Sequence, residues 1–387
     1  MSKAAPWPLL ALGFRPFFLL SGVAALLLML AWLLGWHARF PAAGYYGRIA
    51  WHAHEMLFGY TAAVIAGFLL TAVRNWTGRQ TASGARLAVL ALWWLAGRIA
   101  PWVPGVPPVL VAVTDVTFLP LVAFSLAQVL LRAENRANLV LPLLLLWLAV
   151  ANALMHLQAL GVAETARTGM QLAMDGVLAL LLLIGGRVMP FFIRVAVPGA
   201  EPRNRSWVEQ GTVLLVVLLG LAHVAGWHGV PVAWIALGLG GLQGIRLAGW
   251  HHPGVWRIPI LWVLVTGYGW LVLSLVLGAL AELGGMPLSP AEHAFTAGAI
   301  GVTTLGMMAR VTLGHTGRPM QPPRPMTAAF VLVNLAALFR VGGPTLWPEG
   351  YVFWILLAGT FWVAAFAIFL YRYTPMLLQP RVDGRPG

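Results

Sequence analysis

Residues 49–73 read IAWHAHEMLFGYTAAVIAGFLLTAV, an apolar run of the length that a membrane-spanning helix requires. Two histidines and a carboxylate, His52, His54 and Glu55, lie near its start. Ionisable side chains inside a bilayer are costly unless they are paired, hydrated or bound to a metal, so they indicate function. The alternative is a pair of interfacial histidines that are hydrogen-bonded to neighbouring carbonyl groups.

Helical geometry separates the two histidines. Successive residues advance by about 100°, so side chains two positions apart point in nearly opposite directions. We expect His52 and Glu55 on one face of the helix, and His54 on the other face with Phe58 and Thr61. The segment is therefore predicted to serve two sites, one on each side of the helix.

Composition identifies the class of protein. Of the 387 residues, 60% are apolar and only 9% are charged, and the mean hydropathy is +0.83. These values are typical of a polytopic membrane protein. We predict an all-α fold with about 12 transmembrane helices, in which residues 1–387 form a single transmembrane domain without a soluble domain. The predicted spans are 16–36, 49–73, 85–103, 107–131, 138–160, 168–190, 207–227, 230–249, 257–281, 290–313, 326–343 and 350–371.

Cysteine usage and charge exclude several functions. The chain has no cysteine, which excludes disulfides, thiolate-ligated haem, covalently attached haem c and cysteine-held iron–sulfur clusters. The net charge of +13 comes from basic residues scattered between apolar segments, so we predict no binding of nucleic acid. Nineteen of the 24 lysines and arginines fall on one side of the predicted helices, which places both termini in the cytoplasm.

Polar residues gather in one layer near the outer ends of the predicted helices. Asp115, Asn152 and Asp175 lie at this depth. Four different spans contribute histidines to the same layer, namely His52, His54, His156, His223 and His293, and the outer loops add His37 and His228. Each histidine alone is more often a satisfied polar contact. Together they predict a metal or haem site, because neutral imidazole is a common ligand of iron, copper and zinc and helical bundles build such sites from facing side chains.

A weak internal repeat relates the second and tenth spans at a constant offset of 239 positions. The second span contains His54, Gly59, Gly67 and Thr77-Gly78-Arg79, and the tenth contains His293, Gly298, Gly306 and Thr316-Gly317-Arg318. Glycines on membrane helices allow close approach of a backbone or a ligand, and two matched histidines would place imidazoles on opposite faces of one porphyrin. Coincidence among glycine-rich helices is the alternative. If the sixth span is a further copy, the chain contains three four-helix units.

Several motifs, in order along the chain, resemble those of the NnrS family. They are Gly13–Phe18 (GFRPFF), Trp51–Gly59 (WHAHEMLFG), Ala66–Val73 (AGFLLTAV), Asn75–Gly78 (NWTG), Gly186–Phe192 (GRVMPFF) and Leu305–Arg310 (LGMMAR). The resemblance covers essentially the whole chain. It implies a twelve-span protein of the bacterial inner membrane that contains haem b and copper and is linked to nitric oxide metabolism or resistance. One departure is Val265-Thr266 in the ninth span, where a histidine is expected.

A more distant architectural similarity links the predicted fold to the haem–copper oxidases, and it is an analogy of fold alone. The chain lacks a counterpart of their three-histidine copper site. His251-His252 resembles a copper-binding pair, but the distribution of charge places it in an inner loop, where it is interpreted as solvated.

The resulting hypothesis assigns roles to named residues. His54 and His293 are predicted axial ligands of a noncovalent haem, and His52 is predicted to hold copper together with His156 or His223. Glu55 and Asp175 are candidate acids that supply protons. Arg98 is expected either to pair with a haem propionate or to anchor its helix at the interface.

Three classes of function remain open. A nitric oxide reductase forms nitrous oxide with electrons from an unknown donor, whereas a binder or sensor holds nitric oxide without turnover. A transporter would carry a metal or a nitrosyl complex, but transporters place their polar residues near the midplane, and here these residues gather in the outer half. The lipid bilayer is the expected environment, and a homo-oligomer is left open.

Overall fold

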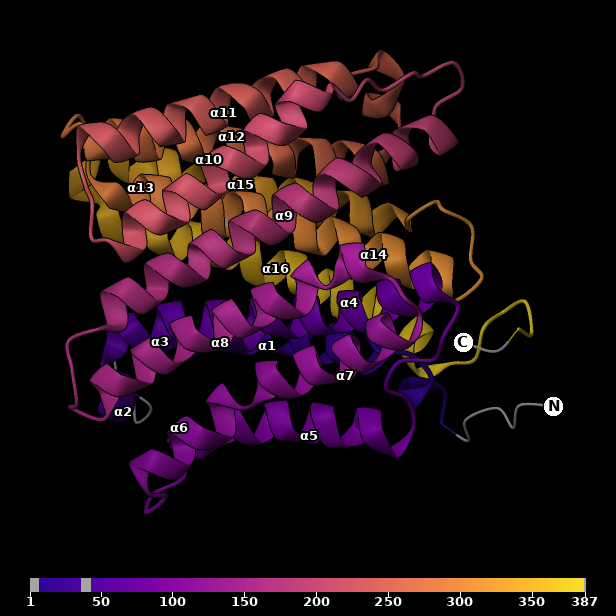
Figure 1. Ribbon diagram of the computed structural model, residues 1–387, viewed down its shortest axis with the longest axis horizontal. Coiled ribbons are helices and arrows are strands. Elements are labelled where there is room, and N and C mark those ends of the chain that lie inside the picture. The colour runs from indigo at the N-terminus through magenta and orange to yellow at the C-terminus, as the bar shows by residue number, and fades with distance from the viewer. Residues whose placement is uncertain (1–6, 36–42, 386–387) are drawn as a thin grey trace. The chain divides into compact units, whose positions relative to one another are not determined.

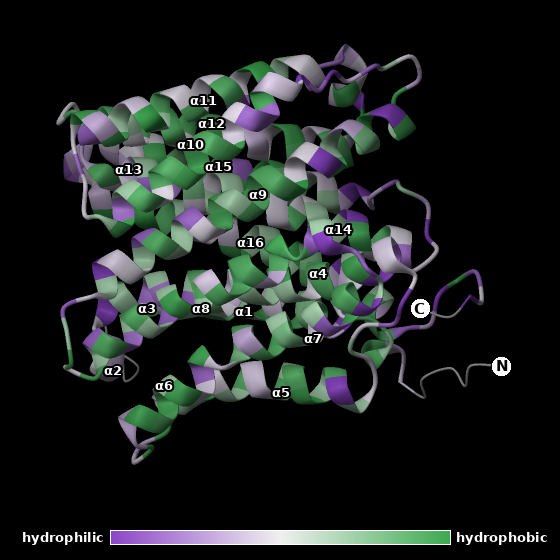
Figure 2. Cartoon of the chain, viewed as in Figure 1, coloured by the Kyte–Doolittle hydropathy of each residue, from purple (hydrophilic) through white to green (hydrophobic). Residues whose placement is uncertain are grey.

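The computed structural model describes residues 7–35 and 43–385. Regular structure in this part of the chain is entirely helical, and 11 of its helices are long and apolar enough to cross a membrane. Figure 2 shows hydrophobic residues along most of the length of these helices. The chain is therefore a multi-pass membrane protein, as the composition predicts.

Contacts between residues divide the chain into two compact units, which are described separately. The first comprises the described residues up to Val177, together with 311–319 and the residues from Leu370 onward; the second comprises Leu178–Arg310 and Met320–Phe369.

In chain order the main helices up to residue 159 are α1 (Phe14–Leu34), α2 (Ala43–Tyr46), α3 (Arg48–His54), α4 (Ala62–Thr77), α5 (Ala85–Ile99), α6 (Pro108–Val116), α7 (Phe118–Arg132) and α8 (Val140–Ala159) (Figure 1). The remaining ones are α9 (Ala166–Ala196), α10 (Ser206–Val224), α11 (Val230–Trp250), α12 (Pro259–Glu282), α13 (Leu288–His293), α14 (Thr303–His315), α15 (Arg324–Leu346) and α16 (Tyr351–Leu378).

The segment 85–103 differs from the other predicted spans. It forms α5, of 15 residues, and ends in a short 3₁₀ helix, η3 (Ala100–Trp102). Pro101 lacks a backbone N–H and cannot continue the hydrogen bonding of an α-helix, which explains why the helix is short. Whether the number of crossings is even or odd follows from Arg15, whose guanidinium donates to the carbonyl oxygens of Leu377 (2.8 Å) and Gln379 (2.7 Å). Because the start of α1 thus meets the end of α16, the number of crossings must be even, which favours α5 as the twelfth span.

The second and tenth spans share an unusual backbone. In the second span α3 ends at His54, a π-helix follows as η2 (Glu55–Thr61), and α4 then runs to Thr77. In the tenth span α13 ends at His293, a π-helix follows as η6 (Ala294–Val302), and α14 continues. π-helical segments are rare and occur often at functional sites. The repeat in the sequence is therefore also a repeat in the backbone.

The repeat has two copies in the described residues. α9, the sixth span, is α-helical along its whole length and contains no π-helical segment. This result favours a twofold repeat over three four-helix units.

The glycines at matched positions of the two copies both allow close packing between helices. A Cβ atom on Gly67 would lie 2.8 Å from Cβ of Phe17 on α1, and one on Gly306 would lie 2.8 Å from Cγ1 of Val263 on α12.

Candidate metal centre

Buried polar side chains of the first unit converge beside the junction of α3 and η2. The side chains of His54, Asp115 and His156 each offer one ligand atom, and these atoms lie within 4.8 Å of one another. Among the described residues this is the one group of three or more histidine or acidic side chains so arranged. All three are buried, with at most 4% exposure. The spacing suits a bound metal ion.

Local structure brings these residues together. Asp115 lies in the last turn of α6, and one residue with near-helical backbone angles, Thr117, separates α6 from α7. Gly97 on α5 leaves room for the carboxylate, because a Cβ atom there would lie 3.0 Å from Oδ1 of Asp115. Asn152 and His156 are one turn apart on α8 and therefore face the same neighbour.

Asp115 is the centre of the cluster. Its Oδ2 atom lies 2.9 Å from Nε2 of His54, 2.9 Å from Nε2 of His156 and 3.2 Å from Nδ2 of Asn152. Its Oδ1 atom forms an ion pair with Arg98. Three nitrogen atoms therefore converge on a single carboxylate oxygen inside the protein.

His54 is enclosed on several sides. Its Nδ1 atom lies 3.2 Å from Oε1 of Glu55, and its Nε2 atom lies 2.9 Å from Oδ1 of Asn152. The ring of Tyr46 stacks on the imidazole with 4.3 Å between centroids, and the Tyr46 hydroxyl lies 3.2 Å from Nε2. Arg98 donates to Oε1 of Glu55 at 2.6 Å, so its guanidinium contacts both carboxylates of the cluster.

The charges of the cluster do not cancel when both imidazoles are neutral. Glu55 and Asp115 contribute two negative charges and Arg98 one positive charge, all buried. An uncompensated buried charge is costly. Both ring nitrogens of His54 face acceptor oxygens, which requires a proton or a metal cation at each nitrogen. The charge of the cluster is balanced either by a protonated His54 or by a bound metal cation.

Tyr45 extends the cluster beyond the predicted spans. Its hydroxyl lies 2.9 Å from Nδ1 of His156. Burial raises the pKa of the Tyr45 hydroxyl to about 12, so the group stays protonated at neutral pH. Its single proton can go to Nδ1, which would leave Nε2 of His156 protonated towards Asp115 or free to bind a metal, or to the carbonyl oxygen of Pro108 at 3.3 Å.

His52 and His54 lie on opposite faces of the helix, as their spacing predicts. His52 stacks on Trp32 with 4.3 Å between ring centroids, whereas His54 contacts Phe58 at 5.2 Å. The prediction that Glu55 shares the face of His52 is wrong. Its carboxylate lies beside His54 with 1% exposure, because the side chain is long enough to turn towards Arg98.

The other predicted site residues lie in different places. His156, expected as a partner of His52, lies with His54 instead. Asp175 is on α9 of the first unit, where its Oδ1 atom accepts a hydrogen bond from Nε2 of Gln171 at 3.4 Å. His223, at the end of α10, belongs to the second unit. His37 lies outside the described residues.

His293 also belongs to the second unit and has a defined tautomer. Its Nδ1 atom lies 2.8 Å from the carbonyl oxygen of Ser289. A carbonyl oxygen only accepts, so Nδ1 carries the proton and Nε2 carries the lone pair. This is the arrangement that metal-binding histidines commonly adopt.

Sequence reasoning missed four residues of the cluster and its extension as site residues, namely Asp115, Asn152, Tyr46 and Tyr45. Asp115 and Asn152 were placed at the right depth but received no role, and Tyr46 lay outside the predicted span. The spacing of Asn152 and His156, four residues apart on one helix, was the available signal, since it directs both towards one neighbour.

None of the curated proteins compared matches the chain. The sequence model of the NnrS family, described as NnrS protein, matches residues 8–381, which is nearly the whole chain. The chain therefore belongs to the NnrS family, whose name links it to nitric oxide metabolism.

Proposed function

We propose that this protein binds nitric oxide at a copper centre formed by His54, Asp115 and His156 and reduces it to nitrous oxide for detoxification. The observation that carries the proposal is the convergence of these three ligand atoms inside the first unit. The family of the chain supports the choice of nitric oxide. The proposed location is the bacterial inner membrane, with the cluster towards the periplasm.

Copper fits the donor set. Two imidazole nitrogens suit copper, zinc, iron or nickel, and copper is the divalent first-row metal that such ligands bind most tightly. The buried excess of negative charge also favours a cation at this position. Asp115 would act both as a ligand through Oδ2 and as the partner of Arg98 through Oδ1, so the guanidinium fixes the carboxylate in place.

Haem does not fit at His54 in this geometry. The ring of Tyr46 covers one face of the imidazole, and Asn152 and Asp115 lie within 2.9 Å of Nε2, which leaves no room for a porphyrin, whereas a single copper ion could be shared between Nε2 and Oδ2 of Asp115. The predicted role of His54 as an axial ligand is therefore not proposed again. His293 fits a haem b ligand better, because its hydrogen bond to Ser289 directs the lone pair to Nε2.

The residues of the chain have separate tasks in this proposal. When bound, copper and haem iron supply the sites for nitric oxide and for electron transfer. Formation of nitrous oxide and water from two molecules of nitric oxide consumes two electrons and two protons. Glu55 is the proposed proton carrier, since its buried Oε2 atom has no hydrogen-bond partner and lies against Gly59. Asp175 remains a candidate for the second proton.

Metal analysis of purified variants tests the proposal. His156→Ala and Asp115→Asn are expected to lower the copper content at least tenfold, since each removes a ligand. His228→Ala is the matched control, because this exposed histidine pairs only loosely with Glu282 at 3.7 Å. Unchanged copper content in both ligand variants would contradict the site.

Turnover is measured separately as nitrous oxide formed from nitric oxide, with electrons from a soluble dye kept reduced by ascorbate. Glu55→Gln keeps the shape of the side chain but removes its charge and is expected to lower the rate at least tenfold. Copper-loaded protein that binds nitric oxide without forming nitrous oxide would establish a binder or sensor instead. Flux of a metal into liposomes that depends on Asp115 would establish a transporter.

A further inference from the structure

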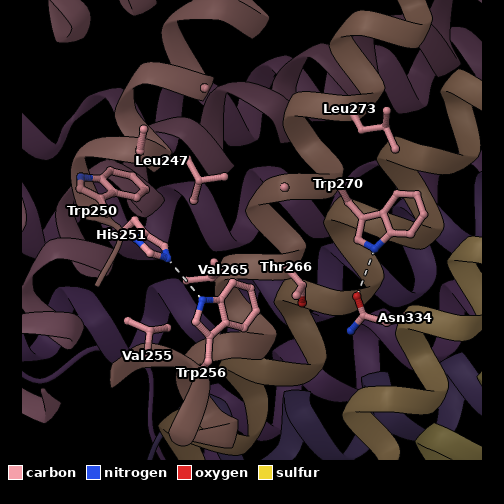
Figure 3. A pocket seen from close by; sticks show the side chains of 13 residues that line it. Leu247, Trp250, His251, Val255, Trp256, Val265, Thr266, Trp270, Leu273 and Asn334 are labelled. Carbon is pink, nitrogen blue, oxygen red and sulfur yellow. Dashed lines mark hydrogen bonds between the residues drawn. The ribbon is translucent and has the colours of Figure 1, made fainter. Parts of the chain in front are cut away.

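The second unit contains a pocket of about 740 Å³ between α11, α12 and the short helix η5 (Pro253–Arg257), with one residue from α15. Figure 3 shows the side chains that surround it. The lining residues are Gly244, Leu247, Ala248, Trp250, His251, Val255, Trp256, Val265, Thr266, Gly269, Trp270, Leu273 and Asn334. The pocket is separate from the metal cluster, which lies entirely in the first unit.

The walls of the pocket favour a flat, neutral molecule. Three tryptophans, Trp250, Trp256 and Trp270, provide aromatic surface, and the other large lining side chains are mostly aliphatic. Lysine, arginine, aspartate and glutamate are absent from its lining. A porphyrin carries two carboxylates and would find no cationic partner among these side chains. A neutral aromatic ring with few hydrogen-bonding groups fits better.

The hydrogen bonds within the wall define what it offers to a ligand. Trp256 donates from Nε1 to Nε2 of His251 at 3.4 Å, so Nδ1 of His251 carries the proton and is a donor. The hydroxyl of Thr266 donates to the carbonyl oxygen of Val263 at 3.0 Å, so its oxygen is an acceptor for the ligand. His251 and Thr266 therefore offer a donor and an acceptor, which suit a quinone carbonyl and a quinol hydroxyl, respectively.

The remaining polar residue has a supporting role. Asn334 accepts a hydrogen bond from Nε1 of Trp270 at 3.1 Å and donates to the carbonyl oxygen of Phe330 at 2.8 Å. Figure 3 shows this bond on the side of the pocket opposite His251. Asn334 thus fixes the plane of the Trp270 ring, against which a flat ligand can stack.

Two of the large side chains that line the pocket are exposed. Leu273, in the second half of the membrane-spanning helix α12, is 39% exposed, and Trp256 is 51% exposed. Because α12 spans the membrane, the exposed face of Leu273 would contact lipid, so a molecule dissolved in the bilayer could approach this wall of the pocket.

We propose that this pocket binds the head group of a membrane quinol, which serves as the electron donor of the protein. The proposal rests on the proposed reduction of nitric oxide for the use of the electrons. Oxidation of one quinol to the quinone breaks two O–H bonds and releases two electrons and two protons. These match the two electrons and two protons that two molecules of nitric oxide consume to form nitrous oxide and water.

Trp270 connects the pocket with the second π-helical segment. A Cβ atom on Gly298 of η6 would lie 2.7 Å from the Trp270 ring, so this side chain packs directly on the helix that begins after His293. The wall of the quinol pocket is therefore in contact with the segment proposed to hold haem, which is the arrangement that electron transfer between the two requires.

Binding of a short-chain benzoquinone to the purified protein tests the pocket directly, with quenching of tryptophan fluorescence as the readout. Gly269→Phe fills the pocket and is expected to weaken binding at least tenfold. Gly278→Phe is the control on the same helix, because its surroundings are equally open and it does not line the pocket. Thr266→Val, which removes the acceptor, is expected to weaken binding about fivefold.

Three results would overturn the quinol site: absence of quinone binding to the unaltered protein, equal affinity of Gly269→Phe and Gly278→Phe, or loss of haem from Gly269→Phe with quinone binding intact. Turnover separates this inference from the proposed function. Gly269→Phe is expected to reduce nitric oxide with the ascorbate-reduced dye and to lose turnover with quinol. If the unaltered protein binds quinone but forms no nitrous oxide with either donor, the proposed function fails while the binding site stands.

Discussion

The two π-helical spans have the same backbone and different surroundings. In each, a histidine precedes the π-helix, a glycine one turn later leaves a close contact, and a glycine with positive φ follows the span, Gly78 in one copy and Gly317 in the other. His54, however, lies among two carboxylates and a guanidinium, whereas His293 bonds to a backbone carbonyl. The backbone places a histidine at a defined point, and the residues packed around it determine the chemistry.

The arginines show the same difference. Arg98 on α5 contacts both Glu55 and Asp115. Arg340 on α15, the helix that follows the second copy, donates to the hydroxyl of Ser289 at 3.3 Å. Arg98 compensates two buried carboxylates, whereas Arg340 also hydrogen-bonds to Tyr351 and interacts electrostatically with a single carboxylate, Glu292. This contrast predicts unequal consequences when each arginine is removed.

Arg98→Met is expected to have the largest effect on stability. It leaves Glu55 and Asp115 buried without their cation, and breaking such a buried ion pair costs about 3–5 kcal/mol. Arg340→Met loses the hydrogen bonds to Ser289 and Tyr351 and the interaction with one carboxylate instead of two, and is expected to cost less, about 1.5–3 kcal/mol. Reversible unfolding in mixed micelles with increasing SDS measures both. Equal losses would show that the two surroundings are energetically alike.

The next largest effect is expected on metal content, because each of two histidine variants should lose one cofactor and keep the other. His156→Ala is expected to lower the copper content at least tenfold and to leave the haem content unchanged. His293→Ala is expected to do the reverse. Iron and copper analysis, together with the absorption spectrum of the reduced protein, measures both outcomes. Loss of both cofactors from both variants in folded protein would show that the two histidines serve one shared site.

The helices could be predicted from the sequence more completely than the candidate site. Long apolar runs predicted the helices because the bilayer demands about 20 apolar residues per crossing, and only the short α5 departed from that length. The offset between His54 and His293 predicted the repeat. The π-helices themselves were not predictable, since they change the angular position of every following residue without an evident signal in the sequence.

The cluster depended on contacts between distant segments, which periodicity within one helix does not reveal. Asp115 meets His54 because α6 ends near Thr117 and because Gly97 leaves space for its carboxylate. The direction of Glu55 was misjudged for a related reason. The helical angle of the backbone gives the starting direction of a side chain, but its carboxylate follows the nearest cation, here Arg98.

Alanine at the matched glycines of the scaffold is expected to have a moderate effect in both copies. Gly67→Ala places a methyl group 2.8 Å from Cβ of Phe17, which is tied to its backbone, and the expected cost is about 1–3 kcal/mol. Gly306→Ala meets side-chain ends of Val263 and Leu264 at the same distance, and these can shift, so the cost is expected near the lower end of that range. Unfolding in SDS gives both values. A stabilising effect at either position would contradict the close packing.

The smallest expected effect concerns the glycine that ends each span. Gly78 and Gly317 have φ values of 65° and 75°, and an L-residue in this left-handed conformation costs about 1–2 kcal/mol. Gly78→Ala has open space around it, so its cost should be that of the backbone alone, and Gly78→Asn should cost less because asparagine tolerates this conformation. Gly317→Ala also meets the carboxylate of Asp383 at 2.8 Å, but this side chain lies near the surface and can move, so the two copies should differ little.

Gly241→Ala is the control. This glycine lies in the middle of α11 with open space around it and an ordinary helical φ, so the substitution should stabilise the protein by about 0.5–1 kcal/mol. Equal losses of stability at Gly78 and Gly317, with a gain at Gly241, would show that the repeat includes the ends of the two spans as well as their π-helical segments. A cost confined to one copy would restrict the repeat to the histidine and its π-helix.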